Sequence, residues 1–206
     1  MWSLRQTLAP TVEPVTLEEL KDHLRGVSTA DEDALLQSYL CVAREAVEVE
    51  EVSRALLTQT LELRLDGWPW SHRVGIYSRG IRLPRPPLQS VSSIAYIDAN
   101  GATQTLDAAL YTVDPYVEPG RIVPAYGVAW PNLRAVPACV TVTYVAGWTD
   151  RGKVPERIRH AIKLLAGELY ENREAATAEA ALARIPTYEH LLISTRCVYD
   201  FGRDCR

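Results

Sequence analysis

The sequence predicts an α+β fold, in which a helical bundle of three main helices carries an inserted small antiparallel β-sheet and an extended C-terminal tail. Three stretches repeat apolar residues every three or four positions, which is the period of a helix with one buried face. Between the second and the third stretch the period falls to two, as in a strand with one buried face. The 206 residues and the 47% hydrophobic content are enough for one domain, or for one domain with an insertion.

The first two helices are predicted from the residues at their starts. Thr16 followed by Glu19 has the spacing of a capping box, in which each side chain binds the backbone N–H of the other residue. Thr29 and Glu32 repeat this spacing before the second helix. That helix should end near Ser53, although the glycine that usually stops a helix is missing there.

The changes of period also predict the order of the domains. Residues 1–15 hold two prolines and little periodicity, so we expect an irregular N-terminal arm. The helical bundle should be formed by residues 16–54 and 154–175, and the third helix lies in the second of these ranges. Residues 55–150 should form the inserted β-rich domain, and residues 176–206 a C-terminal tail that binds a partner.

The insertion contains seven short segments with the character of strands. Turn signals separate them, which favours an antiparallel sheet over βαβ units. One of these signals, Asn100-Gly101, is typical of a type I′ hairpin turn. The segments are residues 57–65, 80–83, 91–97, 103–106, 110–113, 121–123 and 139–145.

A proline-rich corner precedes the central hairpin of the insertion. Pro84, Pro86 and Pro87 remove three backbone donors and fix three φ angles. These restrictions disfavour a central strand and favour a rigid corner or a sheet edge. We predict that Arg82, Arg85 and Pro86 at this corner contact a neighbouring subunit.

Composition and motifs argue against several functions. The net charge of −4 gives no general nucleic-acid-binding surface, and no stretch approaches the roughly 18 apolar residues of a membrane span. The sequence lacks the P-loop, dinucleotide-binding, zinc-protease and nucleophile-elbow motifs, and its four histidines stand too far apart for a local metal cluster. Its four cysteines are typical of reduced thiols in a protein made in a cytoplasm. We therefore predict no enzyme activity, no metal and no cofactor.

Several stretches, taken together, resemble the head–tail connector (adaptor) proteins of long-tailed bacteriophages and of gene transfer agents. The resemblance covers roughly residues 14–174 and depends on the order and distances of the stretches more than on any one of them. Two departures stand out: Val52-Ser53 lies where members often have Thr-Gly, and Ser194 lies where a proline is common. The stretches are VTLEELKDHLR, DEDALLQSYLCVAREAVE, RALLTQTLELRLDGWP, LPRPPLQSVSSIAYIDANG, VTVTYVAGW and VPERIRHAIKLLAGELYENRE.

The resemblance implies a structural virion protein. Members of this family form a ring, commonly a dodecamer of about twelve copies, under the portal of the DNA-filled head. The expected partners are therefore the portal protein, the stopper or tail-completion proteins and further copies of the chain. Genomic DNA would pass through the ring without sequence-specific binding, and no membrane is involved. The expected location is the virion neck, after synthesis in the host cytoplasm.

The tail is predicted to bind the portal. Its apolar residues follow neither a helical nor a strand period, so no regular element of the tail would bury them. The alternative is that the tail folds back on its own bundle. The predicted portal-binding residues are Tyr188, Leu191, Leu192, Arg196, Tyr199 and Phe201.

Two other classes stay open from the sequence. Another neck or tail-completion protein, such as a stopper, would be a small β-barrel without a helical bundle. A host soluble protein-interaction module, or an enzyme with a dispersed site, would not lie between portal, protease and capsid genes on one side and tail genes on the other. The genome neighbourhood therefore separates the host classes from a neck protein, and the three predicted helices argue against a stopper.

Overall fold

The structure is a computed structural model that divides into two compact units. The β-rich unit comprises Met1–Ala9 and Thr58–Gly147, and the helical unit comprises Pro10–Leu57 and Trp148–Arg196. The described residues form three α-helices and two antiparallel sheets, which confirms the predicted α+β class. The residues that the structure describes are 1–24, 30–69, 80–171, 192 and 194–196.

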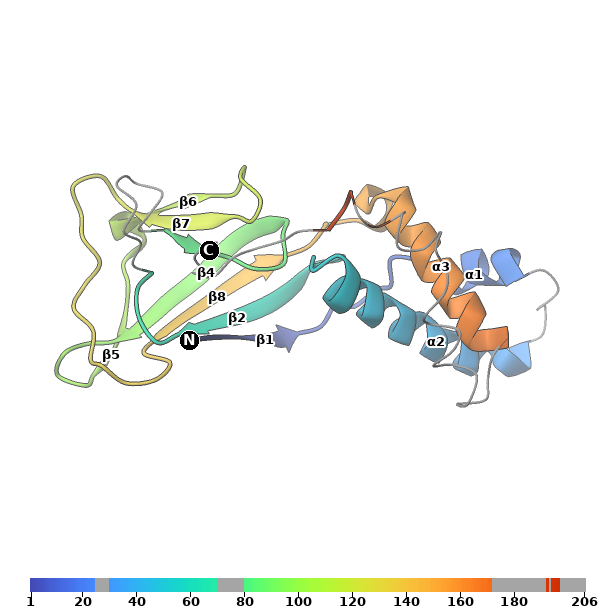
Figure 1. Cartoon of the computed structure of the whole chain (residues 1–206), viewed down its shortest axis with the longest axis horizontal. Helices are drawn as coiled ribbons and strands as arrows, with labels where there is room; N and C mark the ends of the chain where they lie inside the picture. The colour runs from blue at the N-terminus through green and yellow to red at the C-terminus, as the bar shows by residue number, and fades with distance from the viewer. Residues whose placement is uncertain (25–29, 70–79, 172–191, 193, 197–206) are drawn as a thin grey trace, which may run out of the picture. The chain divides into compact units, whose positions relative to one another are not determined.

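The larger sheet of the β-rich unit has five strands in the order β1-β2-β8-β4-β5, and each pair of neighbours is antiparallel (Figure 1). Alternate residues of β2 and β8 are buried, because successive side chains of a strand point to opposite faces. Tyr144 of β8 is fully buried among these residues. The strands are β1 (Trp2–Leu8), β2 (Gln59–Leu65), β4 (Leu88–Ile97), β5 (Thr103–Thr105) and β8 (Val140–Ala146).

The start of the chain is a strand, so the prediction of an irregular arm over residues 1–15 was wrong for Trp2–Leu8, whereas residues 9–15 form no helix or strand. β1 pairs with β2, with Leu4 opposite Leu63 and Arg5 opposite Glu62. The opposite charges of Arg5 and Glu62 suit a cross-strand pair. β1 also supplies partners for the backbone groups of β2, which would otherwise lie at the sheet edge. The signal was weak because Trp2 and Leu4 are the only apolar residues that alternate before Gln6.

A smaller sheet of three strands completes the β-rich unit, in the order β3-β7-β6. Its strands are short, and Arg121 of β7 donates two hydrogen bonds to one carboxylate oxygen of Asp114 at 2.7 and 3.0 Å. A short 3₁₀ turn, Ala108–Leu110, leads into it. The strands are β3 (Ile81–Arg82), β6 (Tyr111–Asp114) and β7 (Arg121–Pro124).

The hairpin between β4 and β5 differs from the predicted type I′ turn. Only Gly101 has a positive φ, of 91°, whereas a type I′ turn needs two such residues. The N–H of Gly101 donates to the carbonyl of Asp98. The Asp98 carboxylate accepts hydrogen bonds from the N–H groups of Asn100 and Ala102. The loop is therefore a three-residue connection in which the aspartate side chain holds the backbone.

The helical unit packs three helices around one apolar core. Its core residues come from all three helices and from the segments beside them, and Leu40, Val47 and Ile162 are fully buried. No described helix is long and apolar enough to cross a membrane. The helical elements are α1 (Leu17–Leu24), the 3₁₀ turn η1 (Ala30–Glu32), α2 (Asp33–Ala46), the π-helical turn η2 (Val47–Glu51), the 3₁₀ turn η5 (Arg151–Lys153) and α3 (Glu156–Glu171).

The capping box predicted at Thr16 is confirmed. The backbone N–H of Glu19 donates to the Thr16 hydroxyl at 3.1 Å, and the backbone N–H of Thr16 donates to the Glu19 carboxylate at 2.9 Å. The equivalent prediction for Thr29 and Glu32 lies partly outside the described residues, because residue 29 is not described.

Ser53 ends the second helix in the conformation that glycine usually takes. The helix widens into the π-turn η2, where the N–H of Val52 donates to the carbonyl of Val47. Ser53 then adopts a φ of 52°, in the left-handed region. The missing glycine at this corner is thus replaced by a serine in the same backbone conformation.

Candidate functional site

The proline corner is held in place by hydrogen bonds from the β-rich unit. The buried hydroxyl of Tyr144 donates to the carbonyl of Pro84 at 2.7 Å. The N–H of Gly147 donates to the carbonyl of Pro87 at 2.8 Å, and Leu83 donates to Gly120 at 2.7 Å. The prolines lack N–H groups, but their carbonyls remain acceptors, so this segment fixes the path between β3 and β4.

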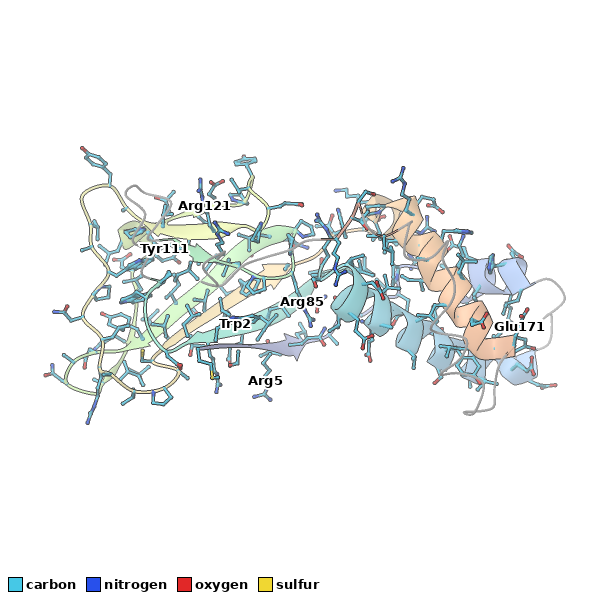
Figure 2. The ribbon with its side chains drawn as sticks, viewed as in Figure 1. Trp2, Arg5, Arg85, Tyr111, Arg121 and Glu171 are labelled. Carbon is cyan, nitrogen blue, oxygen red and sulfur yellow. The ribbon has the colours of Figure 1, made fainter. Side chains whose placement is uncertain are left out.

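The three residues predicted as a subunit contact differ in exposure. Arg82 is exposed, Arg85 is half-buried, and Pro86 is buried within the unit. Arg85, labelled in Figure 2, has a φ of 57° between two prolines. The exposed surface of the corner is therefore arginine side chain rather than Pro86, and the contact itself stays a prediction.

The described part of the C-terminal segment lies on the helical core. The side chain of Leu192 is 2% exposed and belongs to the core of the helical unit. Arg54 donates through Nε to the carbonyl of Thr195 at 2.6 Å, and Arg157 donates to the Ser194 hydroxyl at 3.0 Å. At Leu192 the tail therefore folds back on its own helical bundle, as in the alternative that the sequence left open.

The other predicted portal-binding residues divide into two groups. Arg196 is exposed to solvent. The remaining four, Tyr188, Leu191, Tyr199 and Phe201, lie outside the described residues. Portal binding by any of these residues stays a prediction.

A buried ionic network, which the sequence patterns did not single out, links α2 to the segment before α1. Arg44 lies 3.0 Å from the carboxylate of Glu48, and its Nε lies 2.9 Å from Glu13, as an ion pair without hydrogen-bond alignment. Burial lowers the pKa of Arg44, but the charges of Glu13 and Glu48 outweigh that effect and raise it. Burial, followed by the charge of Glu13, raises the pKa of the Cys41 thiol. The spacing of Arg44 and Glu48, four residues apart on one helix, was the available signal.

A second polar cluster joins α1 to α3. Arg159 of α3 binds the carboxylate of Glu19 and donates to the carbonyl of Pro14. The rings of His23 and His160 meet edge to face with their centroids 5.8 Å apart. Burial, followed by the charges of His160 and Lys163, lowers the pKa of His23. These groups bind one another, so the cluster fastens two helices together.

Neither cluster has the composition of a metal or catalytic centre. Within the described ranges, no group of three or more histidine, cysteine, aspartate or glutamate side chains could hold a metal ion. Ion pairs within the chain occupy the carboxylates of both clusters.

Exposed large apolar side chains occur in both units. In the helical unit they are concentrated on α2 and η2, at Leu35, Val42 and Val49. In the β-rich unit they lie on β1, where Trp2 is 39% exposed, and near the small sheet, where Tyr116 and Tyr126 are fully exposed. Figure 2 shows Trp2 and Arg5 on β1, which is an edge strand.

Comparisons with protein-family models and with curated proteins find no match for this chain. Comparison with solved structures does find matches, and they are to particle components. The chain is similar to a protein in the neck of an empty gene transfer agent (GTA) particle, computed with C6 symmetry, with a TM-score of 0.75 and 27% identity. That match covers 97% of this chain and 98% of the solved one.

Two further matches come from the same kind of particle. One is to a chain in the virion of a native GTA particle, with a TM-score of 0.73, 28% identity and 97% of each chain covered. The other is to a chain in the neck of a native GTA particle, computed with C12 symmetry, with a TM-score of 0.72 and 25% identity over 97% of this chain and 98% of that one. The class that these likenesses support is a structural neck protein of a phage-like particle.

Proposed function

We propose that this chain is a head–tail connector (adaptor), which forms a ring under the portal, continues the DNA channel and joins the head to the stopper and tail. The observation that carries the proposal is the similarity to neck proteins along 97% of the chain, both units included. The C6 and C12 symmetries of the two neck structures support a ring of this chain. In this proposal the predicted insertion, residues 55–150, supplies most of the β-rich unit, and β1 is added to it from the start of the chain. Portal binding is assigned to the tail, residues 176–206, except Leu192, which is buried in the helical core.

The charge of the chain agrees with a passage for DNA. Each copy carries a net charge of −4, so a ring of copies is strongly negative. Proteins that grip DNA neutralise phosphates with lysine and arginine, and a negative ring does not. DNA would therefore slide through the channel without sequence-specific binding.

Binding to the cognate portal tests the proposal. The purified chain and the portal are mixed and sedimented together, and the complex is imaged by electron microscopy. We expect a ring of this chain with the symmetry of the portal. No affinity for the portal, together with tail attachment in particles that lack the chain, would refute the proposal.

The role of the tail needs a deletion that spares the helical core. Removing everything from Tyr188 onward also removes Leu192, which is buried in that core, so a loss of binding there could reflect a loss of folding. Deletion of residues 197–206 keeps Leu192. We expect this shorter deletion, or Tyr199→Ala with Phe201→Ala, to abolish portal binding with an unchanged circular dichroism spectrum. Tyr126→Ala, which removes an exposed aromatic ring from the β-rich unit, is the matched control.

A further inference from the structure

The outward side of the second helix carries an apolar stripe. Leu35, Val42 and Val49 are 36%, 50% and 45% exposed, and they follow one another at intervals of seven residues. At about 100° per residue Leu35 and Val42 fall within roughly 20° of each other around α2, and Val49 follows in the π-turn η2. The core of the unit is reached from the other side of the same helix, through Leu40 and Val47. We call these three residues the α2 stripe.

Acidic residues accompany the C-terminal half of the α2 stripe. Glu45 is exposed, and its ion pair with Arg44 lies at the surface. Glu50 is exposed, and no described cation pairs with it. Negative charge near the C-terminal end of a helix opposes the helix dipole, so these glutamates do not serve the stability of their own helix.

Two exposed cations lie at the start of the third helix, on either side of the exposed Glu156, which pairs with Arg159. Lys153 and Arg157 are exposed, and they donate to the hydroxyls of Thr149 and Ser194. Within the described part of the chain neither forms an ion pair. Positive charge at a helix N-terminus also opposes the dipole. Leu164, seven residues after Arg157 and half-exposed, continues this side of α3 with an apolar group.

The two charged surfaces lie at the same end of the helical unit. The N–H of Arg54 donates to the carbonyl of Glu48 at the end of the second helix, and the Arg54 side chain donates to Thr195. Arg157 at the start of α3 binds Ser194, beside Thr195. In Figure 1 the end of α2 and the start of α3 also lie at one end of the helical unit. In two copies placed side by side without a shift along the ring axis, the end of the second helix of one copy therefore lies at the level of the start of α3 of the next.

We propose that the α2 stripe, with Glu45 and Glu50, packs against Lys153, Arg157 and Leu164 of a second copy of this chain. The inference rests on the proposed function, because a ring needs head-to-tail contacts between two different surfaces. Contact of the stripe with itself across a two-fold axis would bring Glu45 and Glu50 of both copies together, which like-charge repulsion disfavours. Charge complementarity therefore selects the α3 surface of the next copy.

Charge reversal on each surface tests the proposal. One variant carries Glu45→Lys and Glu50→Lys, and the other carries Lys153→Glu and Arg157→Glu. The matched control is Glu18→Lys with Asp22→Lys, the same change of charge on exposed residues of α1. Self-association is measured by sedimentation equilibrium for the chain alone, and ring occupancy on the portal is counted by native mass spectrometry. Circular dichroism confirms that each variant is folded.

We expect each variant alone to lose self-association at least tenfold and to form no complete ring. An equimolar mixture of the two variants should restore both, because every contact in an alternating ring then joins opposite charges. One chain that carries all four substitutions should behave in the same way. The α1 control should behave as wild type.

The outcomes separate this inference from the proposed function. In one outcome, the wild type and both single-surface variants form complete rings on the portal. That outcome overturns the inference and is consistent with the connector function. In a second outcome, the two charge reversals abolish self-association and the mixture restores it, but no form of the chain binds the portal. That outcome supports the contact and overturns the connector function. A wild-type chain that self-associates in neither setting overturns the inference as well.

Discussion

Replacing Arg44 by methionine should destabilise the helical unit severely. Arg44 has side-chain N–O distances of 2.9, 3.0 and 3.2 Å to Glu13, Glu48 and Glu45. The contact with Glu45 lies at the surface and is worth less than about 1 kcal/mol. The side chains of Glu48 and Glu13 are only 2% and 17% exposed, so methionine leaves two carboxylates without their shared cation.

The expected loss is about 3–5 kcal/mol of unfolding free energy, as for other buried ion pairs that lose one partner. Urea unfolding followed by far-ultraviolet circular dichroism measures it. Adding Glu48→Gln to Arg44→Met should recover about 1–3 kcal/mol, because one stranded charge is removed. Glu45→Gln, the control, should change stability by less than about 1 kcal/mol. A loss below about 1 kcal/mol in Arg44→Met would refute the reasoning, since the carboxylates would then be reaching water.

Three further changes should give smaller effects. Ser53→Gly should stabilise the chain by about 0.5–1 kcal/mol in urea unfolding, because glycine takes a positive φ without steric cost, and a lower midpoint would contradict this. Burial lowers the pKa of His23 from about 6.5, so the unfolded chain binds that proton more tightly and stability falls as the pH drops below about 6.5. His23→Gln should show a shallower fall between about pH 7 and 5, and equal falls would count against it. Gly120→Ala would place a Cβ 2.7 Å from Leu88 and lower the free energy of unfolding by about 1–3 kcal/mol. The control is Gly67→Ala, whose Cβ meets no atom within 4 Å, and equal losses in the two variants would contradict the prediction.

Periodicity predicted the kinds of element because burial acts on each element separately. The alternation of Leu61, Leu63 and Leu65 marks one face of β2, and all three side chains are buried. The Thr16–Glu19 capping box was equally legible because both partners lie within one turn. Patterns of this kind depend only on residues within one element, and not on residues far away in the sequence.

Features that depend on distant residues could not be predicted from such signals. β1 is a strand because β2, more than fifty residues later, offers it an edge, and its own sequence alternates weakly. Leu192 gave no period, yet it is buried against helices far away in the sequence. Glu13 is unremarkable until the fold places it beside Arg44. In each case the partner supplies the information that the local pattern lacks.

The division of the chain into two interleaved units has a consequence for its synthesis. The described chain passes between the units at residues 9–10, 57–58 and 147–148, so each unit is assembled from separated segments. During translation α1 and α2 emerge roughly one hundred residues before α3, with the apolar faces that α3 will cover still open. A single proteolytic cut at one crossing would still leave the two units covalently joined through the others. We therefore expect the incomplete chain to aggregate more readily than the complete one, and a single cut to leave the two units of the complete chain joined.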